Sequence, residues 1–210
     1  MIGGGFEFAG VAGASNRPPA EIAKAARAYA MLPYDAVLLA PADLQVLKEG
    51  NVPSSPAWKN PGPAPEVLER DVPEGKLAFI LFPQESDKEE ETSALAEKLR
   101  QSGKFNLIVG VSTWGSARET AFINSKGSVF DIILGSGEGP GYTGLYMADN
   151  QVLWVRPFGK GMGVNSVIIP AMPRPGKKIV WEPESTVLTR NTPLNDAVTA
   201  DPQIRAALNP

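Results

Sequence analysis

The sequence predicts an α/β fold in which a largely parallel or mixed β-sheet is covered by helices. Short continuous apolar runs, typical of strands covered on both faces, recur along the first two thirds of the chain. Helical patterns separate several of these runs, and tight turns replace them after Gly139. With 210 residues, 43% of them hydrophobic, the chain is long enough to bury one sizeable core.

The N-terminal third predicts one helix and one buried strand. Pro18 and Pro19 open the helix, and Pro33 ends it. Residues 35–40 are an apolar run and are predicted to form the first buried strand. Residues 51–74 are rich in proline, so we expect an irregular segment there.

The central third predicts three more strands and a helix. Residues 76–82, 105–111 and 129–134 are apolar runs that predict buried strands. Residues 87–102 read as a helix with an acidic first turn and a basic last turn, which complements the helix dipole.

The last third predicts short strands joined by turns. The expected strands are residues 145–148, 152–155, 164–170 and 178–182. Residues 159–163 are rich in glycine and are interpreted as a hairpin turn. We predict one domain over residues 1–190, and a tail or linker helix over residues 191–210.

Composition excludes several classes of site. The net charge of −3 and the pI near 5.2 give no basic surface for nucleic acid or for an anionic membrane. No segment has the roughly 18 consecutive apolar residues of a membrane span. Cysteine and histidine are both absent, which excludes disulfides, thiolate sites, Ser-His-Asp catalysis and histidine-ligated metals. A metal site would need oxygen ligands, which favour calcium or magnesium.

Four loops follow the buried strands, and ligands of open α/β sheets bind at the carboxyl ends of the strands. These loops are residues 40–44, 83–86, 112–115 and 135–139. The candidate ligand-binding residues within them are Asp43, Ser112, Thr113, Trp114 and Glu138. No residue is assigned a catalytic role, and no metal ligand is assigned.

Each candidate has an alternative interpretation. Trp114 could stack on a base or a sugar, or it could cover the core. The glycine-rich residues 135–141 could cradle an anion with backbone N–H groups, or they could form a plain turn. Asp43 and Glu138 could hold a calcium ion only if the fold brings them together.

The same loops carry a family resemblance. Three segments supply it: Tyr34-Asp35-Ala36-Val37 with the turn at residues 40–44, Gly110-Val111-Ser112-Thr113-Trp114-Gly115, and Asp131-Ile132-Ile133-Leu134-Gly135-Ser136-Gly137-Glu138-Gly139. In order and spacing, nearly the whole chain resembles the 5′-nucleotidase branch of the calcineurin-like metallophosphoesterases, the UDP-sugar hydrolase-like N-terminal domain. The resemblance implies a mixed-sheet α/β sandwich with C-terminal β-hairpins. It also implies that the first strand of the domain precedes residue 1.

The chain departs from that family at the metal ligands. The Gly-Asn-His-Glu motif falls on Ala40-Pro41-Ala42-Asp43, the histidine of the Ser-His-Leu-Gly loop on Thr113, and the two histidines of the Gly-His-x-His loop on Gly137 and Gly139. The early Gly-Asp motif would fall near residues 3–6, which contain no aspartate. A two-metal site polarises a phosphoryl oxygen and activates a water. The side chains that remain are too few to hold such a site.

We therefore expect a catalytically inactive metallophosphoesterase-like domain that serves as a ligand-binding or interaction module. We expect no cofactor and no divalent metal, and either a small phosphorylated ligand or a protein partner. Two alternatives stay open. One is a residual phosphoester hydrolase, which requires Asp43, Glu138 and a third carboxylate to converge on an oxygen-ligated divalent metal. The other is a purely structural role. The resemblance implies a periplasmic or otherwise exported protein, as part of a larger polypeptide.

Overall fold

The computed structural model describes residues 1–10, 17–85 and 87–208. The chain divides into two compact units. Unit 1 comprises Met1–Asn60 and Asn195–Pro210, and unit 2 comprises Pro61–Leu194. Both units combine helices with β-sheet, which confirms the predicted α/β class. The single domain over residues 1–190 stays a prediction.

Unit 1 is built on a small parallel sheet with strand order β1-β2-β3. Its elements are β1 (Ile2–Gly3), α1 (Pro19–Ala30), β2 (Ala36–Leu38), α2 (Pro41–Glu49), β3 (Trp58–Lys59) and α5 (Pro202–Leu208). The predicted apolar strand is the central strand β2, which is buried along its whole length. Its Val37 packs with Phe8, with Ile22 of α1 and with Leu47 of α2, so burial of these apolar side chains holds unit 1 together.

Unit 2 is built on a six-stranded sheet with order β4-β5-β6-β7-β9-β8. Its strands are β4 (Glu66–Val72), β5 (Gly75–Leu81), β6 (Leu107–Val111), β7 (Ile132–Leu134), β8 (Tyr142–Met147) and β9 (Val152–Arg156). Strands β5, β6, β7 and β9 are parallel, while β4 and β8 are antiparallel edge strands. The predicted mixed sheet is therefore confirmed.

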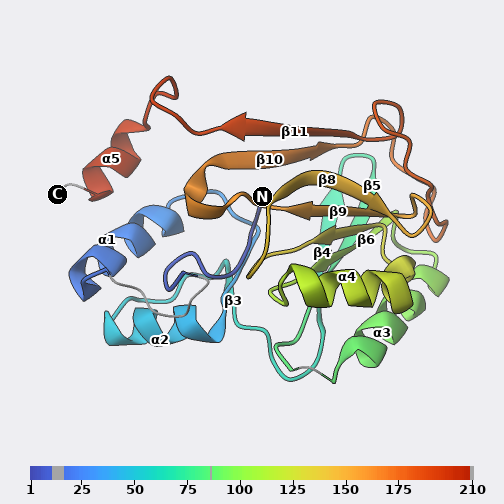
Figure 1. The fold of residues 1–210 in the computed structure, drawn as a ribbon, viewed down its shortest axis with the longest axis horizontal. Coiled ribbons are helices and arrows are strands. Elements are labelled where there is room, and N and C mark those ends of the chain that lie inside the picture. Colours follow the sequence, from blue (N-terminus) through green and yellow to red (C-terminus); the bar gives the residue numbers. More distant parts are fainter. Residues whose placement is uncertain (11–16, 86, 209–210) are drawn as a thin grey trace. The chain divides into compact units, whose positions relative to one another are not determined.

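The six-stranded sheet is covered on both faces (Figure 1). Helices α3 (Glu89–Gln101) and α4 (Ser116–Ser125) pack on one face, against Ile108 of β6 and Trp154 of β9. The other face packs against Trp181 and the antiparallel pair β10 (Gly163–Ile168) and β11 (Leu188–Pro193). Since successive strand residues point to opposite faces, central strands covered on both sides must be apolar throughout.

Several elements differ from the sequence expectation. The predicted irregular segment at residues 51–74 contains β3 and most of β4, and the predicted loop at residues 40–44 begins α2. Helix α4 was not predicted at all. Residues 159–163 do not close a hairpin, because β9 and β10 belong to different sheets and a 3₁₀ turn (Gly159–Gly161) lies between them. The strand expected at residues 178–182 is absent from this described stretch.

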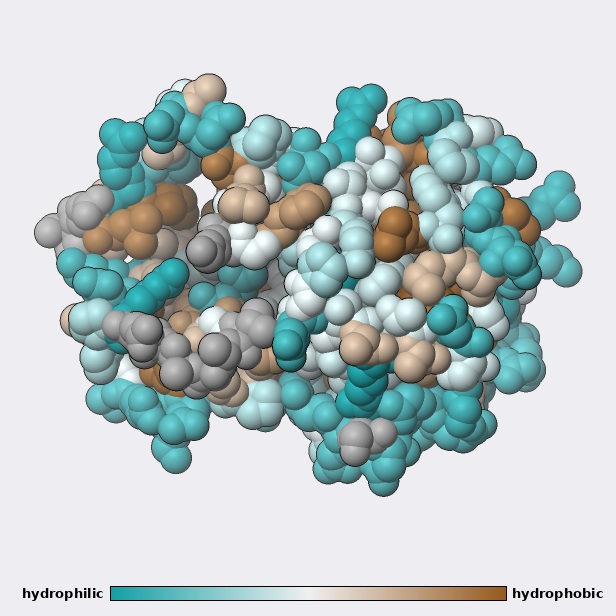
Figure 2. Space-filling view, in the orientation of Figure 1, coloured by the Kyte–Doolittle hydropathy of each residue, from teal (hydrophilic) through white to brown (hydrophobic). Residues whose placement is uncertain are grey.

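The surface seen in Figure 2 alternates hydrophilic residues with separate hydrophobic patches. Large apolar side chains that are exposed include Met31, Met162, Val164 and Val180. Scattered exposed apolar residues are normal for folded proteins. The helices within residues 1–10, 17–85 and 87–208 are all too short or too polar to cross a lipid bilayer.

Candidate functional site

The predicted loops of unit 2 meet where the parallel strands end. We call this the carboxyl edge, formed by residues 83–85 after β5, 112–115 after β6 and 135–140 after β7. Ser112, Thr113, Trp114 and Glu138 all belong to it. Asp43 belongs to unit 1, where it sits in the first turn of α2.

Asp43 is fully buried and its carboxylate is saturated by backbone donors. Oδ1 accepts the N–H groups of Phe8 and Ala9, each at 2.9 Å. Oδ2 accepts those of Phe6 at 2.6 Å and Ala40 at 3.0 Å. The last contact is the reach of an N3 acid back to the residue before the helix. Asp43 thus fixes the segment after β1 onto the start of α2, which is a structural task.

Ser112 and Thr113 are also engaged inside the chain. Ser112 is fully buried; its Oγ accepts the N–H of Trp114 at 3.0 Å, and its hydroxyl bonds to the carboxylate of Glu119. Thr113 is 7% exposed, and its Oγ1 accepts a hydrogen bond from Nε2 of Gln84 at 3.2 Å. These hydroxyls order the loop after β6, so they offer few free polar atoms to a ligand.

Trp114 covers the apolar core on the helical face. Its ring meets Phe82 at 4.7 Å and Phe122 at 5.3 Å between centroids, and its indole N–H donates to the carbonyl of Pro83. The guanidinium of Arg118 lies 3.7 Å from the ring centroid, an intramolecular cation–π contact. Arg118 in turn pairs with Glu89 at 2.7 Å. The geometry matches the core-cover interpretation of Trp114.

A buried salt bridge between Glu119 of α4 and Arg156 of β9 organises the carboxyl edge. Glu119 is 0% exposed and Arg156 is 2% exposed. Glu119 also accepts the indole N–H of Trp154 at 2.9 Å and the N–H of Ser136 at 3.3 Å. No sequence motif marked this pair, since its members are 37 residues apart in the chain. The available signal was an arginine ending an otherwise apolar strand.

Arg156 uses all five of its N–H groups, four on the loop of residues 136–140 and one on Glu119 of α4. Nε donates to the carbonyl of Pro140 at 3.0 Å. Nη1 donates to Glu119 and to the carbonyl of Ser136, and Nη2 to the carbonyls of Gly137 and Glu138, each at 2.9 Å. A guanidinium has five donors in a fixed planar fork, so this set is complete. Arg156 therefore acts as the internal support of residues 136–140.

Electrostatics and packing both hold Glu119 in place. Burial raises the pKa of Glu119, while the Arg156 guanidinium and the hydrogen bonds from Trp154 and Ser112 oppose that rise. A Cβ atom at Gly135 would lie 2.0 Å from a carboxylate oxygen of Glu119, and one at Gly139 would lie 2.0 Å from the hydroxyl of Ser116. Close packing thus requires glycine at positions 135 and 139.

Glu138 is an exposed acid of the carboxyl edge, as is Glu85. The carbonyl of Glu138 accepts the N–H of Ser116 at 2.7 Å as well as the Arg156 bond. Within the described part of the chain, no three Asp or Glu side chains gather into a group suited to a metal ion. The residues at the edge do not fit a metal centre, because Glu119, its buried acid, is already paired with Arg156 and the acids described there form no such group.

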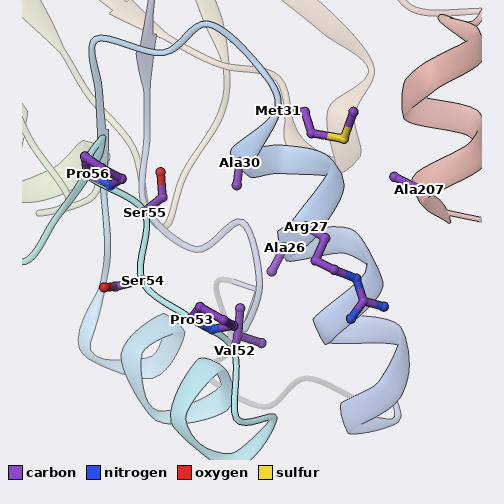
Figure 3. Close-up of a pocket in the computed structure, with 10 residues that line it drawn as sticks. All are labelled: Ala26, Arg27, Ala30, Met31, Val52, Pro53, Ser54, Ser55, Pro56 and Ala207. Carbon is purple, nitrogen blue, oxygen red and sulfur yellow. The ribbon is translucent and has the colours of Figure 1, made fainter.

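A cavity of about 630 Å³ lies in unit 1. Its lining comes from α1, from residues 52–56 and from Ala207 of α5 (Figure 3). The walls are mainly apolar, and Arg27 is the charged residue among them. None of the candidate residues from the sequence lines it.

No protein-family model matches this sequence, and no curated protein does. Several solved structures are similar to the chain, and two of them follow. One is a hypothetical protein from Thermus thermophilus, with 11% identity and a TM-score of 0.44 over 76% of this chain and 88% of that chain. The other is the NAD nucleotidase NadN of Haemophilus influenzae, with 14% identity and a TM-score of 0.46 over 84% of this chain and 45% of that chain.

Proposed function

We propose that this chain is a non-catalytic, metallophosphoesterase-like domain that acts by binding a ligand or a partner. The observation that carries the proposal is the buried Glu119–Arg156 pair. It supports the loop on which the family resemblance would place two metal-binding histidines, at Gly137 and Gly139. An arginine stays protonated at any physiological pH, so it can neither bind a metal ion nor act as a general base.

The unit 1 candidate supports the same proposal. The family resemblance places Asp43 in a motif that serves the metal site. In this chain its two oxygens accept four backbone N–H groups at 2.6–3.0 Å. A carboxylate so occupied contributes to stability through charge-assisted hydrogen bonds. A metal ligand at this position would have to give up several of them.

A partner at the carboxyl edge would meet the side chains that remain outside. Glu138 is exposed, and Arg118 keeps 24% of its side chain accessible above Trp114. Both charges stand on a rigid base, because the residues beneath them are hydrogen-bonded within the loop. We propose that this edge contacts a protein partner, that a small phosphorylated ligand binds elsewhere in the domain, and that the domain works outside the cytoplasm as part of a larger polypeptide.

The test is a phosphoesterase assay on the purified chain with manganese, zinc, calcium or magnesium added, together with elemental analysis of bound metal. We expect turnover of nucleotides and of an aryl phosphodiester to stay at the blank, with less than one metal ion per chain. Metal-dependent turnover that disappears in Glu138→Gln would overturn the proposal in favour of a hydrolase with an oxygen-ligated metal. Glu182→Gln is the matched control, because Glu182 is an exposed acid outside the carboxyl edge.

A further inference from the structure

A second buried carboxylate lies at the opposite, amino edge of the unit 2 sheet. Asp131 precedes β7 and is 0% exposed. Its Oδ2 accepts hydrogen bonds from the N–H of Ile108 and from Nη2 of Arg100, each at 2.8 Å. Its Oδ1 lies 3.5 Å from Nζ of Lys178. Two cations therefore share a single carboxylate, which can balance only one of them.

A cavity of about 560 Å³ opens beside these two cations. Its lining comes from α3, from the end of α4 with the following 3₁₀ turn, and from two later loops. The lining residues are Ser93, Glu97, Arg100, Gln101, Ser125, Lys126, Ser128, Val129, Gln151, Gly176 and Lys178. This volume is in the range of small-molecule sites, and the walls are rich in polar side chains.

The charges around the cavity favour an anion. Three cations line it, Arg100, Lys126 and Lys178, against one carboxylate, Glu97. Lys126 also pairs with Glu90, whose side chain is 78% exposed. Such surface pairs contribute little and exchange readily. With Asp131 buried beneath, the cavity retains an excess of positive charge.

The donors around the cavity are not all used. Arg100 donates through Nη1 to the carbonyl of Lys177 at 3.0 Å, and through Nη2 to Val129 and Asp131. Its Nε is buried and has no hydrogen-bond partner among the residues that the structure describes. An unpaired buried donor is unfavourable. The three bonds use three of the five guanidinium N–H groups, so a second N–H on Nη1 remains besides the buried one on Nε.

Lys178 is sensitive to charge in this cavity. Burial, together with repulsion from Arg100, lowers the pKa of Lys178 to about 8, while Asp131 opposes the change. Glu97 and Lys126 are the other charged groups of the lining. An anion in the cavity would favour the protonated amine. Anion binding is therefore expected to weaken as pH rises through about 8.

We propose that this cavity binds a small molecule through a phosphate group held by Arg100, Lys126 and Lys178. Phosphate fits because three cations line the cavity against Glu97 and the buried Asp131, which leaves an excess of one positive charge for an anion. The site lies on the opposite edge of the sheet from Glu138. It goes beyond the proposed function and does not depend on whether the carboxyl edge is catalytic.

The test uses pyridoxal 5′-phosphate as a probe. The amine of Lys178 adds to the aldehyde carbon and water leaves; borohydride then transfers hydride to the imine and leaves a stable secondary amine. Peptide mass spectrometry locates the label. We expect Lys178 to react at least about fivefold faster with this probe than with pyridoxal, which lacks the phosphate. A fivefold ratio corresponds to about 1 kcal/mol of attraction between the phosphate and the cavity. Inorganic phosphate should slow the reaction.

Two variants and an internal control sharpen the test. Lys126→Gln and Arg100→Gln should each reduce the preference for the phosphorylated probe, and Lys126→Gln removes only an exposed ion pair, so folding is retained. Lys104, exposed and outside the cavity, should react alike with both probes. Equal rates of both probes at Lys178, or no protection by inorganic phosphate, would overturn the proposal.

Discussion

The two edges of the unit 2 sheet each bury one carboxylate, yet they are built differently. At the carboxyl edge, Glu119 faces one guanidinium, and all five N–H groups of Arg156 have acceptors. At the amino edge, Asp131 faces two cations, and only three of the five N–H groups of Arg100 have acceptors among the described residues. A complete hydrogen-bond network stabilises the fold, while an incomplete one beside a cavity can still bind an anion.

Exposure separates the same two edges. Arg156 is 2% exposed, so its charge cannot meet a ligand without opening the loop. The side chain of Lys178 is 24% exposed and lines a cavity, so its amine can meet a ligand there. A buried carboxylate beside a basic residue therefore does not by itself identify a binding site. The number of cations beside the carboxylate, and whether all their N–H groups have acceptors, decide whether the group can bind an anion.

The largest expected effect comes from breaking the closed network. Arg156→Met removes the countercharge of the buried Glu119 and the donors to the carbonyls of residues 136–138 and 140. Removing one partner of a buried pair costs about 3–5 kcal/mol, so we expect a loss of that size in the free energy of unfolding, measured with urea. Arg190→Met, at an exposed arginine of β11, is the control and should change it by less than about 0.5 kcal/mol.

A loss of less than about 1 kcal/mol in the free energy of unfolding of Arg156→Met would contradict the role of Arg156 as the internal support of residues 136–140. A Glu119→Leu/Arg156→Met double variant tests the same pair without leaving a single buried charge. It removes both charges together and should be less destabilised than the sum of the two single variants.

The network of Asp131, Arg100 and Lys178 should have a smaller effect on the free energy of unfolding, and this effect should depend on pH. Lys178 has a pKa of about 8 in the folded chain, against an ordinary lysine pKa of 10.5 in the unfolded chain. Between these values the unfolded chain holds the proton and the folded chain does not, so stability from this group rises as pH increases from about 8 to about 10.5. We expect the free energy of unfolding of the wild type to rise by roughly 2–4 kcal/mol relative to that of Lys178→Met across that range.

The measurement is urea unfolding of both proteins at a series of pH values. Below pH 8 the charged, partly desolvated amine contributes little stability, so Lys178→Met should be neutral or slightly stabilising there. A constant difference between the two proteins from about pH 7 to about pH 10 would mean that the amine titrates normally.

The smallest effect tests the packing around Glu119. Gly135→Ala would place a Cβ atom 2.0 Å from a Glu119 oxygen, and overpacking of this kind costs about 1–3 kcal/mol. Gly159→Ala is the matched control, because a Cβ atom there would have no neighbour within 4 Å. Thermal unfolding of the pair should show a lower Tm for Gly135→Ala alone. Equal Tm values would indicate that the loop yields more easily than its hydrogen bonds suggest.

The sequence was informative where one local property decides the structure. Apolar runs predicted β5, β6 and β7, because central strands covered on both faces cannot carry polar side chains. Strand β4 was missed, since it is an edge strand with charged residues and lies in a proline-rich segment. Helix α4 was missed because it is short and its apolar residues form no clear stripe.

The site was harder to predict because its parts come together only in the fold. Asp43 was selected as a candidate for its acid, although its place three residues after Ala40 also suits a helix-start acid. Neither the Glu119–Arg156 pair nor the Asp131–Arg100–Lys178 group has a local pattern, since their members come from separate elements. Spacing in the sequence does not encode such contacts.

The difference between the two edges can be measured in one experiment, a phosphate titration followed by amide NMR chemical shifts at neutral pH. We expect inorganic phosphate to shift the amides of residues 126–131 and 176–178 around the amino-edge cavity. The amides of residues 112–115 and 135–139 at the carboxyl edge should stay unchanged. Shifts confined to the carboxyl edge would contradict the account, because the loop held by Arg156 would then be the anion site.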